Sequence, residues 1–172
     1  MLKIAIILGS TRPNRVGEIV ANWVSDIAYV RSDAEFELVD IAKIGLPFFD
    51  EVMPPITGHY ANQHTKDWAD RVASFDAFVF VTPEYNHSVP AGLKNALDFA
   101  HAEWNNKAAG FVSYGVAGGV RAVEHLRTIL AELQVATVRN QLTLNSYTDF
   151  ENFYDFKPTA QHVERSMRCL TR

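Results

Sequence analysis

Side chains that can donate hydrogen bonds to an anion are concentrated in residues 9–18, just after the first apolar run. Ser10, Thr11, Arg12, Asn14 and Arg15 supply two hydroxyls, an amide and two guanidinium groups. Many short donors with arginine suit a terminal phosphate, which exposes three oxygens. The segment has neither the G-x-G-x-x-G spacing of dinucleotide-binding loops nor the G-K-[ST] ending of a P-loop. It therefore predicts a mononucleotide phosphate site, with a solvated turn that caps a helix as the alternative.

A second polar loop lies between Pro83 and Pro90, after the apolar residues 78–81. A short apolar run without alternation is typical of a strand buried on both faces. Each proline restricts its own backbone and that of the preceding residue, so we expect the loop to keep an extended course. The ligand crevice of an open α/β sheet lies at the carboxyl ends of its strands. The loop is predicted to hold a ligand, with an ordinary stiffened connection as the alternative.

A third candidate is the glycine-rich segment after residues 107–114. Glycines at 115, 118 and 119 allow a flat ligand to approach the backbone, whose N–H groups can bond its polar edge. His59 and His64, in contrast, have no carboxylate-rich surroundings, so we expect no metal site there. Three loops, and no metal, are thus predicted to form the site.

The elements that position these loops follow from the spacing of apolar residues. Strands are predicted at 2–8, 35–40, 78–81, 107–114 and 135–138, with an extended edge piece at 142–144. Helices are predicted at 16–27, 60–74, 91–100, 121–133 and 158–170. In the helix 60–74, we expect Ala61, Trp68 and Val72 to face inward.

Strands that alternate with helices imply right-handed crossovers and a parallel sheet covered on both faces. The predicted fold is α/β, a flavodoxin-like three-layer sandwich with five parallel strands in the order 2-1-3-4-5. This order brings together the ends of strands one, three and four, which carry the three loops.

The composition bounds the class of protein. The chain has 172 residues, 48% hydrophobic and 21% charged, which is typical of a single globular domain over residues 1–172. A net charge of −4 argues against a nucleic-acid surface. No apolar run reaches the ~18 residues of a membrane span, and Gly9 and Arg12 interrupt the apolar start too early for an export signal. We expect a cytoplasmic protein.

The single cysteine, Cys169, cannot close an intramolecular disulfide, and its position does not favour a catalytic thiol.

Residues 41–58 form a long segment that contains prolines at 47, 54 and 55 and several large apolar residues. Long loops inside compact domains tend to be functional. Its apolar residues can pack under the loop, cover a ligand or meet a second subunit. Subunit contact combined with a pocket wall is the favoured interpretation.

Three motifs together resemble the NADPH-dependent FMN reductase family, which includes bacterial quinone, azo-dye and chromate reductases. They are Gly9-Ser10-Thr11-Arg12, the segment P-E-Y-N-H-S-V-P-A-G-L-K-N-A-L-D at 83–98, and Ser113-Tyr114-Gly115 with Gly118-Gly119. The likeness covers residues 2 to about 138, and the P-E-Y-N-x-S-x-P-x-x-L-K-N pattern is highly specific.

The resemblance implies a flavodoxin-like domain that binds FMN non-covalently and forms a homodimer or tetramer, with the site near the subunit boundary. It assigns Ser10, Arg12, Asn14, Arg15, Val16 and Gly17 to the phosphate, Pro83, Glu84, Tyr85 and Asn86 to the flavin ring, and Ser113, Tyr114, Gly115, Gly118 and Gly119 to the other side of the ring. Many members have a Ser-Phe-Asn-like sequence where this chain has Arg15-Val16-Gly17, so the chain departs from the family pattern there.

The implied activity is an oxidoreductase in which NADPH or NADH passes hydride to the flavin and leaves. A quinone-like, azo, metal-ion or free-flavin acceptor then takes its place, which is a ping-pong mechanism. No side-chain acid or base is required, so we predict no catalytic residue. Tyr85, Asn86 and His87 are expected to wall the substrate pocket, and His87 as a proton donor is the less favoured interpretation.

Two alternatives come from other classes of protein. One is an FMN-binding electron carrier or redox-sensing protein with little turnover of nicotinamide, and a remoter one is a nucleotide hydrolase or transferase. Flavodoxins proper are usually strongly acidic, so the mild charge of −4 favours the enzyme. The sequence does not indicate the physiological acceptor or the preferred nicotinamide.

Overall fold

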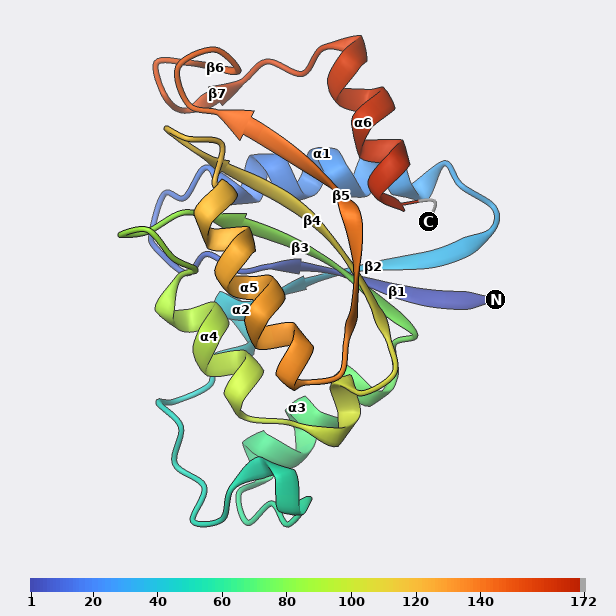
Figure 1. Cartoon of the computed structure of the whole chain (residues 1–172), viewed down its shortest axis with the longest axis vertical. Coiled ribbons are helices and arrows are strands. Elements are labelled where there is room, and N and C mark those ends of the chain that lie inside the picture. Colours follow the sequence, from blue (N-terminus) through green and yellow to red (C-terminus); the bar gives the residue numbers. More distant parts are fainter. Residues whose placement is uncertain (171–172) are drawn as a thin grey trace.

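A parallel sheet of five strands forms the centre of the computed structural model, which describes residues 1–170, with side chains through residue 166. The strands are β1 (Leu2–Leu8), β2 (Ala34–Asp40), β3 (Ala77–Pro83), β4 (Ala108–Gly115) and β5 (Ala136–Asn145), and their order in the sheet is β2-β1-β3-β4-β5 (Figure 1). The predicted fold and strand order are therefore confirmed. The Cys169 side chain lies outside the described residues.

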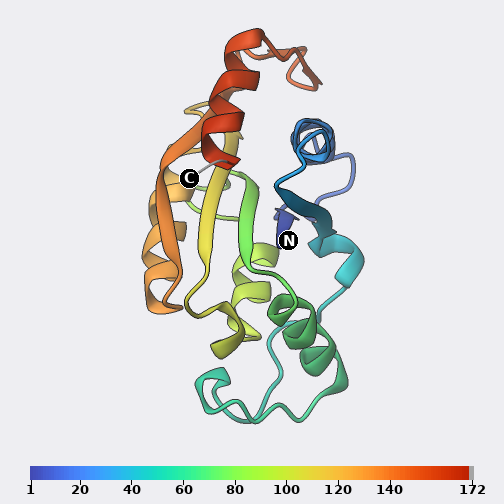
Figure 2. The ribbon, with the colours of Figure 1, turned by 90° about the vertical axis from the view of Figure 1, so that its right-hand side faces the viewer.

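Helices cover both faces of the sheet (Figure 1, Figure 2). The helices are α1 (Gly17–Tyr29), α2 (Ile41–Ile44), α3 (Gln63–Ala73), α4 (Ala91–Asp98), α5 (Val120–Glu132) and α6 (Ala160–Leu170), with single 3₁₀ turns η1 (Pro55–Thr57) and η2 (Ala102–Trp104). A small antiparallel hairpin, β6 (Phe150–Glu151) and β7 (Asp155–Phe156), precedes α6. Among the described residues, no helix is long and apolar enough to cross a membrane.

Two apolar clusters, one on each face, explain why the central strands are apolar throughout. In β1, Ile4, Ile6 and Leu8 pack with the buried side of α1, whereas Ala5 and Ile7 pack with the cluster that contains α3, α4 and α5. Successive side chains of a strand point to opposite faces, so a sheet covered on both faces buries every position.

The fifth strand is longer than predicted. The separate pieces expected at 135–138 and 142–144 belong to one strand, because the pairing register between β4 and β5 shifts between Ala109 and Phe111. Such an irregularity lets a strand continue past residues that do not fit the ladder. Arg127 donates to the carbonyl oxygens of Val138 (2.8 Å) and Arg139 (3.2 Å) there. The strand consequently ends beside β4.

The loop after β3 does not keep the extended course predicted from its two prolines. It folds back in a tight turn, in which the Tyr85 N–H donates to the Ser88 carbonyl (2.9 Å) and the Ser88 N–H donates to the Tyr85 carbonyl (3.1 Å). The two central residues, Asn86 and His87, have φ values of 48° and 74°. Two left-handed central residues define a type I′ turn, which asparagine tolerates well. The prolines constrain only the two ends of the loop.

Helix α3 begins later than predicted, at Gln63, and Ala61 is exposed. The Glu51 carboxylate accepts hydrogen bonds from the N–H groups of Ala61 (2.8 Å) and Asn62 (3.0 Å). These bonds hold the two residues as part of the preceding loop. They also fasten the segment 41–58 to the start of α3.

The glycine turn after β4 is held from behind by a chain of hydrogen bonds. The Gln141 amide donates to the Ser113 hydroxyl (2.9 Å), which donates to the Gly118 carbonyl (2.6 Å). Gly119 has a φ of 70°, and a Cβ built there would lie 2.8 Å from the Ser113 Cβ and 2.9 Å from the Tyr114 nitrogen. The turn therefore has no room for a side chain at this position.

We expect Gly119→Ala to lower the free energy of unfolding by at least about 1 kcal/mol more than Gly45→Ala, because overpacking adds to backbone strain. Gly45 has a similar φ of 68°, but a Cβ there meets no atom within 4 Å. Urea unfolding of both variants measures the difference. Equal losses would show that only the left-handed backbone matters at Gly119.

Candidate functional site

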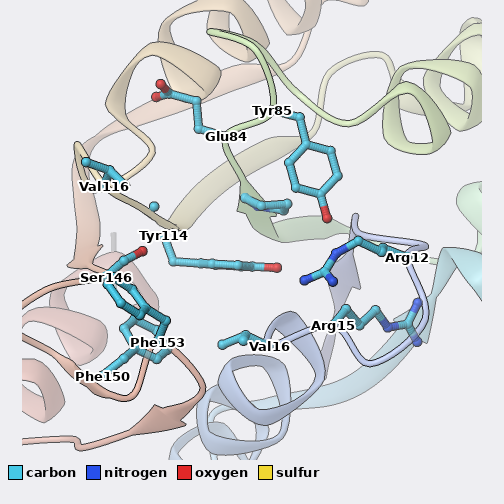
Figure 3. A pocket seen from close by; sticks show the side chains of 12 residues that line it. Arg12, Arg15, Val16, Glu84, Tyr85, Tyr114, Val116, Ser146, Phe150 and Phe153 are labelled. Carbon is cyan, nitrogen blue, oxygen red and sulfur yellow. The ribbon is translucent and has the colours of Figure 1, made fainter.

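A cavity of about 250 Å³ opens at the edge of the sheet where the strands end. Its walls come from the loops after β1, β3, β4 and β5: Arg12, Arg15, Val16, Pro83, Glu84, Tyr85, Tyr114, Gly115, Val116, Ser146, Phe150 and Phe153. Figure 3 shows the two arginines at one end, the residues after β5 at the other, and Tyr114 between them.

The pairing register brings these loops together. Leu8 at the end of β1 pairs with Val81, and the Gly9 N–H donates to the Val81 carbonyl (2.9 Å). Gly115 at the end of β4 pairs with Asn145 at the end of β5. The carboxyl ends of adjacent parallel strands thus share one edge, where ligands of such sheets bind.

The two arginines of the first loop differ in what they contact. Arg15 is nearly buried, donates to the Ser10 carbonyl (2.5 Å) and forms an ion pair with Asp40 (2.5 Å). Arg12 is exposed, makes no hydrogen bond or ion pair within the described part of the chain, and points toward the cavity (Figure 3). Arg15 therefore shapes the loop, whereas Arg12 is a cation that is available to a ligand.

The Tyr114 side chain lies under the first loop. Its hydroxyl is 3.4 Å from the Ser10 hydroxyl oxygen, and a Cβ at Gly17 would lie 2.3 Å from the Tyr114 oxygen. Glycine at 17 thus permits this close approach. Burial raises the pKa of Tyr114 above its ordinary value, so the hydroxyl stays protonated and can donate a hydrogen bond.

The Glu84 carboxylate is turned away from the cavity (Figure 3). It forms an ion pair with the Arg121 guanidinium and accepts a hydrogen bond from the Arg121 N–H (3.1 Å). Burial alone would raise the pKa of Glu84, but the interactions with Arg121 outweigh it and lower this pKa. The side chain therefore fastens the loop after β3 to the start of α5, and only its stem adjoins the cavity.

The structure brings eight of the predicted site residues to the cavity wall: Arg12, Arg15, Val16, Pro83, Glu84, Tyr85, Tyr114 and Gly115. Eight others do not line it: Ser10, Asn14, Gly17, Asn86, His87, Ser113, Gly118 and Gly119. Most of these are buried behind the wall or, like Asn14, lie exposed in a turn. The cofactor role assigned to all these residues stays a prediction.

Two predicted wall residues lie on the far side of the turn after β3. Asn86 lines a different cavity together with Lys94 and Ile129. The His87 ring centroid is 6.0 Å from that of His125. The type I′ turn places both side chains away from the main cavity.

Sequence reasoning missed four wall residues, namely Val116, Ser146, Phe150 and Phe153. Three of them follow β5, whose predicted end at residue 138 left no fourth loop at this edge. The apolar residues 142–144 were the available signal, because a strand that includes them ends beside Gly115. Val116 carries no polar group or special backbone requirement, so its residue type gives no sign of a place in the wall.

The arrangement combines a free cation, flat aromatic walls and a backbone turn at one cavity. A cation binds an anionic group, and aromatic faces favour a flat conjugated ring. The site is thus built for a flat ligand with a negatively charged tail.

Comparison with known proteins agrees with this chemistry. The family model of the NADPH-dependent FMN reductases matches residues 2–149. An NAD(P)H-dependent FMN reductase from Nectria sp is 39% identical over 158 residues, which cover 87% of this chain and 79% of that protein. A quinone reductase from Escherichia coli K12 is 36% identical over 146 residues, which cover 81% of this chain and 74% of that protein.

A solved structure shows the same fold. The flavoenzyme NAD(P)H:(acceptor) oxidoreductase of Paracoccus denitrificans superposes with a TM-score of 0.72 at 21% identity, over 98% of this chain and 99% of that chain. This structural likeness shows the fold alone, whereas the family model and the relatives in sequence show the family. The chain belongs to the NADPH-dependent FMN reductase family, whose members are oxidoreductases that use FMN with NAD(P)H as electron donor.

Proposed function

We propose that the cavity binds FMN non-covalently and that the protein uses it to pass electrons from NAD(P)H to a small oxidant. The observation that carries this proposal is the shared cavity of the Arg12 guanidinium and the aromatic walls Tyr85 and Tyr114. One ligand in this cavity could therefore bind its anionic group at the arginine and its flat ring at the tyrosines.

The end of the cavity near Arg12 fits the phosphate of FMN. Arg12 supplies a guanidinium without a protein partner among the described residues. Helix α1 starts at Gly17 in the same loop, and no side chain caps its first turn. Its free N–H groups and positive dipole end therefore also favour an anion.

The wall formed by Tyr114 and Gly115 fits the flavin ring. Tyr114 offers a protonated hydroxyl, and Gly115 exposes backbone beside it. Bound FMN would supply the hydride chemistry, while the chain holds it in place and controls access to its face. Among the described residues that line the cavity, Glu84 carries the only carboxylate, and it pairs with Arg121. We therefore propose no catalytic acid or base.

We further propose ping-pong turnover, in which donor and acceptor use the same open slot in turn. Donor and acceptor would both reach bound flavin past the walls of the cavity that holds it. Quinones are the favoured acceptors, since relatives that are 34–36% identical are named 2-hydroxy-1,4-benzoquinone reductase and quinone reductase. The two names point to flat, conjugated oxidants.

We also infer a homo-oligomer that uses the segment 41–58. Phe48 and Val52 are each 88% exposed, and Ile56 is 67% exposed. Asn95 holds the segment on α4, since it donates to the Pro47 carbonyl (2.7 Å). Pro47, Phe48 and Asn95 line a second cavity of about 510 Å³, whereas Val52 and Ile56 line neither that cavity nor the 250 Å³ one. A contact with a second copy therefore accounts for the exposed Val52 and Ile56 better than a pocket wall does.

We expect Arg12→Ala to weaken FMN binding by roughly 1.5–3 kcal/mol, the scale of a charge-assisted hydrogen bond. Fluorescence titration of the apoprotein with FMN measures this loss. Arg139→Ala removes an exposed arginine that does not line the cavity and should leave FMN affinity unchanged. Equal affinities for the wild type and Arg12→Ala would refute the phosphate assignment.

We expect the FMN-loaded protein to oxidise NADPH or NADH when benzoquinone is present. Ping-pong turnover gives parallel lines in double-reciprocal plots at several quinone concentrations. Intersecting lines would contradict the shared slot. Absence of turnover with both nicotinamides would favour an electron carrier.

We expect the double substitution Phe48→Asp and Val52→Asp to yield monomers, because two buried charges without partners disrupt an apolar interface. Light scattering after size exclusion gives the mass. Tyr29→Asp, at a 56% exposed apolar residue outside this segment, serves as the control. A wild-type protein that is monomeric at all concentrations would contradict the proposed homo-oligomer.

A further inference from the structure

The turn between β6 and β7 contains a phenylalanine, Phe153, with a left-handed backbone. The Tyr154 N–H donates to the Glu151 carbonyl (3.1 Å), and the two central residues, Asn152 and Phe153, have φ values of 51° and 62°. This is a type I′ turn, in which glycine is the preferred second central residue. A bulky side chain in the left-handed region is a genuine outlier, and such strain tends to persist at functional sites.

Burial in the core does not explain why Phe153 occupies this position. The side chain is 55% exposed, and its ring lines the cavity at the end opposite Arg12 (Figure 3). Tyr147 packs against the ring edge to face, with the centroids 5.3 Å apart. Tyr154, in the same turn, is also 55% exposed but does not line the cavity. The left-handed backbone thus accompanies a ring that faces the site.

The segment that carries Phe153 is fastened to the wall of the cavity. Asn145 donates through its side-chain amide to the Val116 carbonyl (2.9 Å) and accepts from the Tyr147 N–H (2.8 Å). Its own N–H donates to the Asp149 carboxylate (2.7 Å). These bonds hold the chain around Tyr147 beside the glycine turn after β4, and the Tyr147 ring in turn contacts Phe153.

We propose that Phe153, supported by Tyr147, is a specificity residue that binds the flat, conjugated ring of the electron acceptor. This inference rests on the function proposed above. An aromatic face recognises such a ring by stacking or by an edge-to-face contact. Phe153 lies beyond residues 2–149, which match the family model, and at the far end from the phosphate site. It therefore suits a ligand that varies between members better than the shared cofactor.

The test is Phe153→Gly in the FMN-loaded protein, with 1,4-naphthoquinone as the probe. We expect the dissociation constant for naphthoquinone, measured by calorimetry without a nicotinamide, to rise about three- to tenfold. The melting temperature should rise, because glycine relieves the strained turn. A purely structural phenylalanine would give the opposite change in stability. Tyr154→Ala is the matched control and should leave naphthoquinone binding unchanged.

Several results would overturn the inference. They are an unchanged naphthoquinone dissociation constant in Phe153→Gly, an equal loss in Tyr154→Ala, or a loss of FMN affinity of similar size, which would place the ring against the cofactor. Phe153→Asn, which also tolerates the left-handed backbone, must give the same direction of change. Failure of the wild type to oxidise NAD(P)H would count against the proposed function, whereas these binding measurements test Phe153 by themselves.

Discussion

The site depends on one constraint, which is that adjacent parallel strands end at the same edge of a sheet. Four chain segments far apart in sequence are forced to share the space beyond β1, β3, β4 and β5. Since each segment supplies only a few side chains, none of them forms a pocket alone. The arginine, the aromatic side chains and the glycine turn lie close together because strand pairing places all of them at this edge of the sheet.

Ion pairs then fix the loops in that shared space. Asp40 holds Arg15, and Glu84 holds Arg121, so the loops after β1 and β3 are each connected to a neighbouring element. Removing one partner of the nearly buried Arg15–Asp40 pair leaves an uncompensated charge, which is strongly unfavourable. Charged residues of the site thus fall into two kinds, those that keep the walls in place and Arg12, which remains available.

The sequence predicts the parts of this arrangement that depend on local pattern. Apolar runs and one alternating segment predict five strands and their order, although the fifth strand ends too early. Two polar loops and a glycine-rich segment predict three of the four walls. What it does not reveal depends on distant partners. Arg12 and Arg15 look alike in sequence, and the ion pair of Arg15 with Asp40, 25 residues away, is what the sequence could not reveal. The polar residues near Arg139 interrupt the apolar pattern of β5, so the sequence does not show that the strand continues. Arg127 of α5 donates to the carbonyl oxygens of Val138 and Arg139, where the backbone is irregular. The aromatic wall that follows β5 could therefore not be predicted either.

The two tight turns at the rim, centred on Asn86 and on Asn152, are closed by their own backbone hydrogen bonds. Neither turn needs a bound molecule to acquire its shape. An entering ligand would therefore lose little free energy to the ordering of these two turns. A rim that is already folded suits the ping-pong turnover proposed above, in which the slot would empty and refill twice in every catalytic cycle.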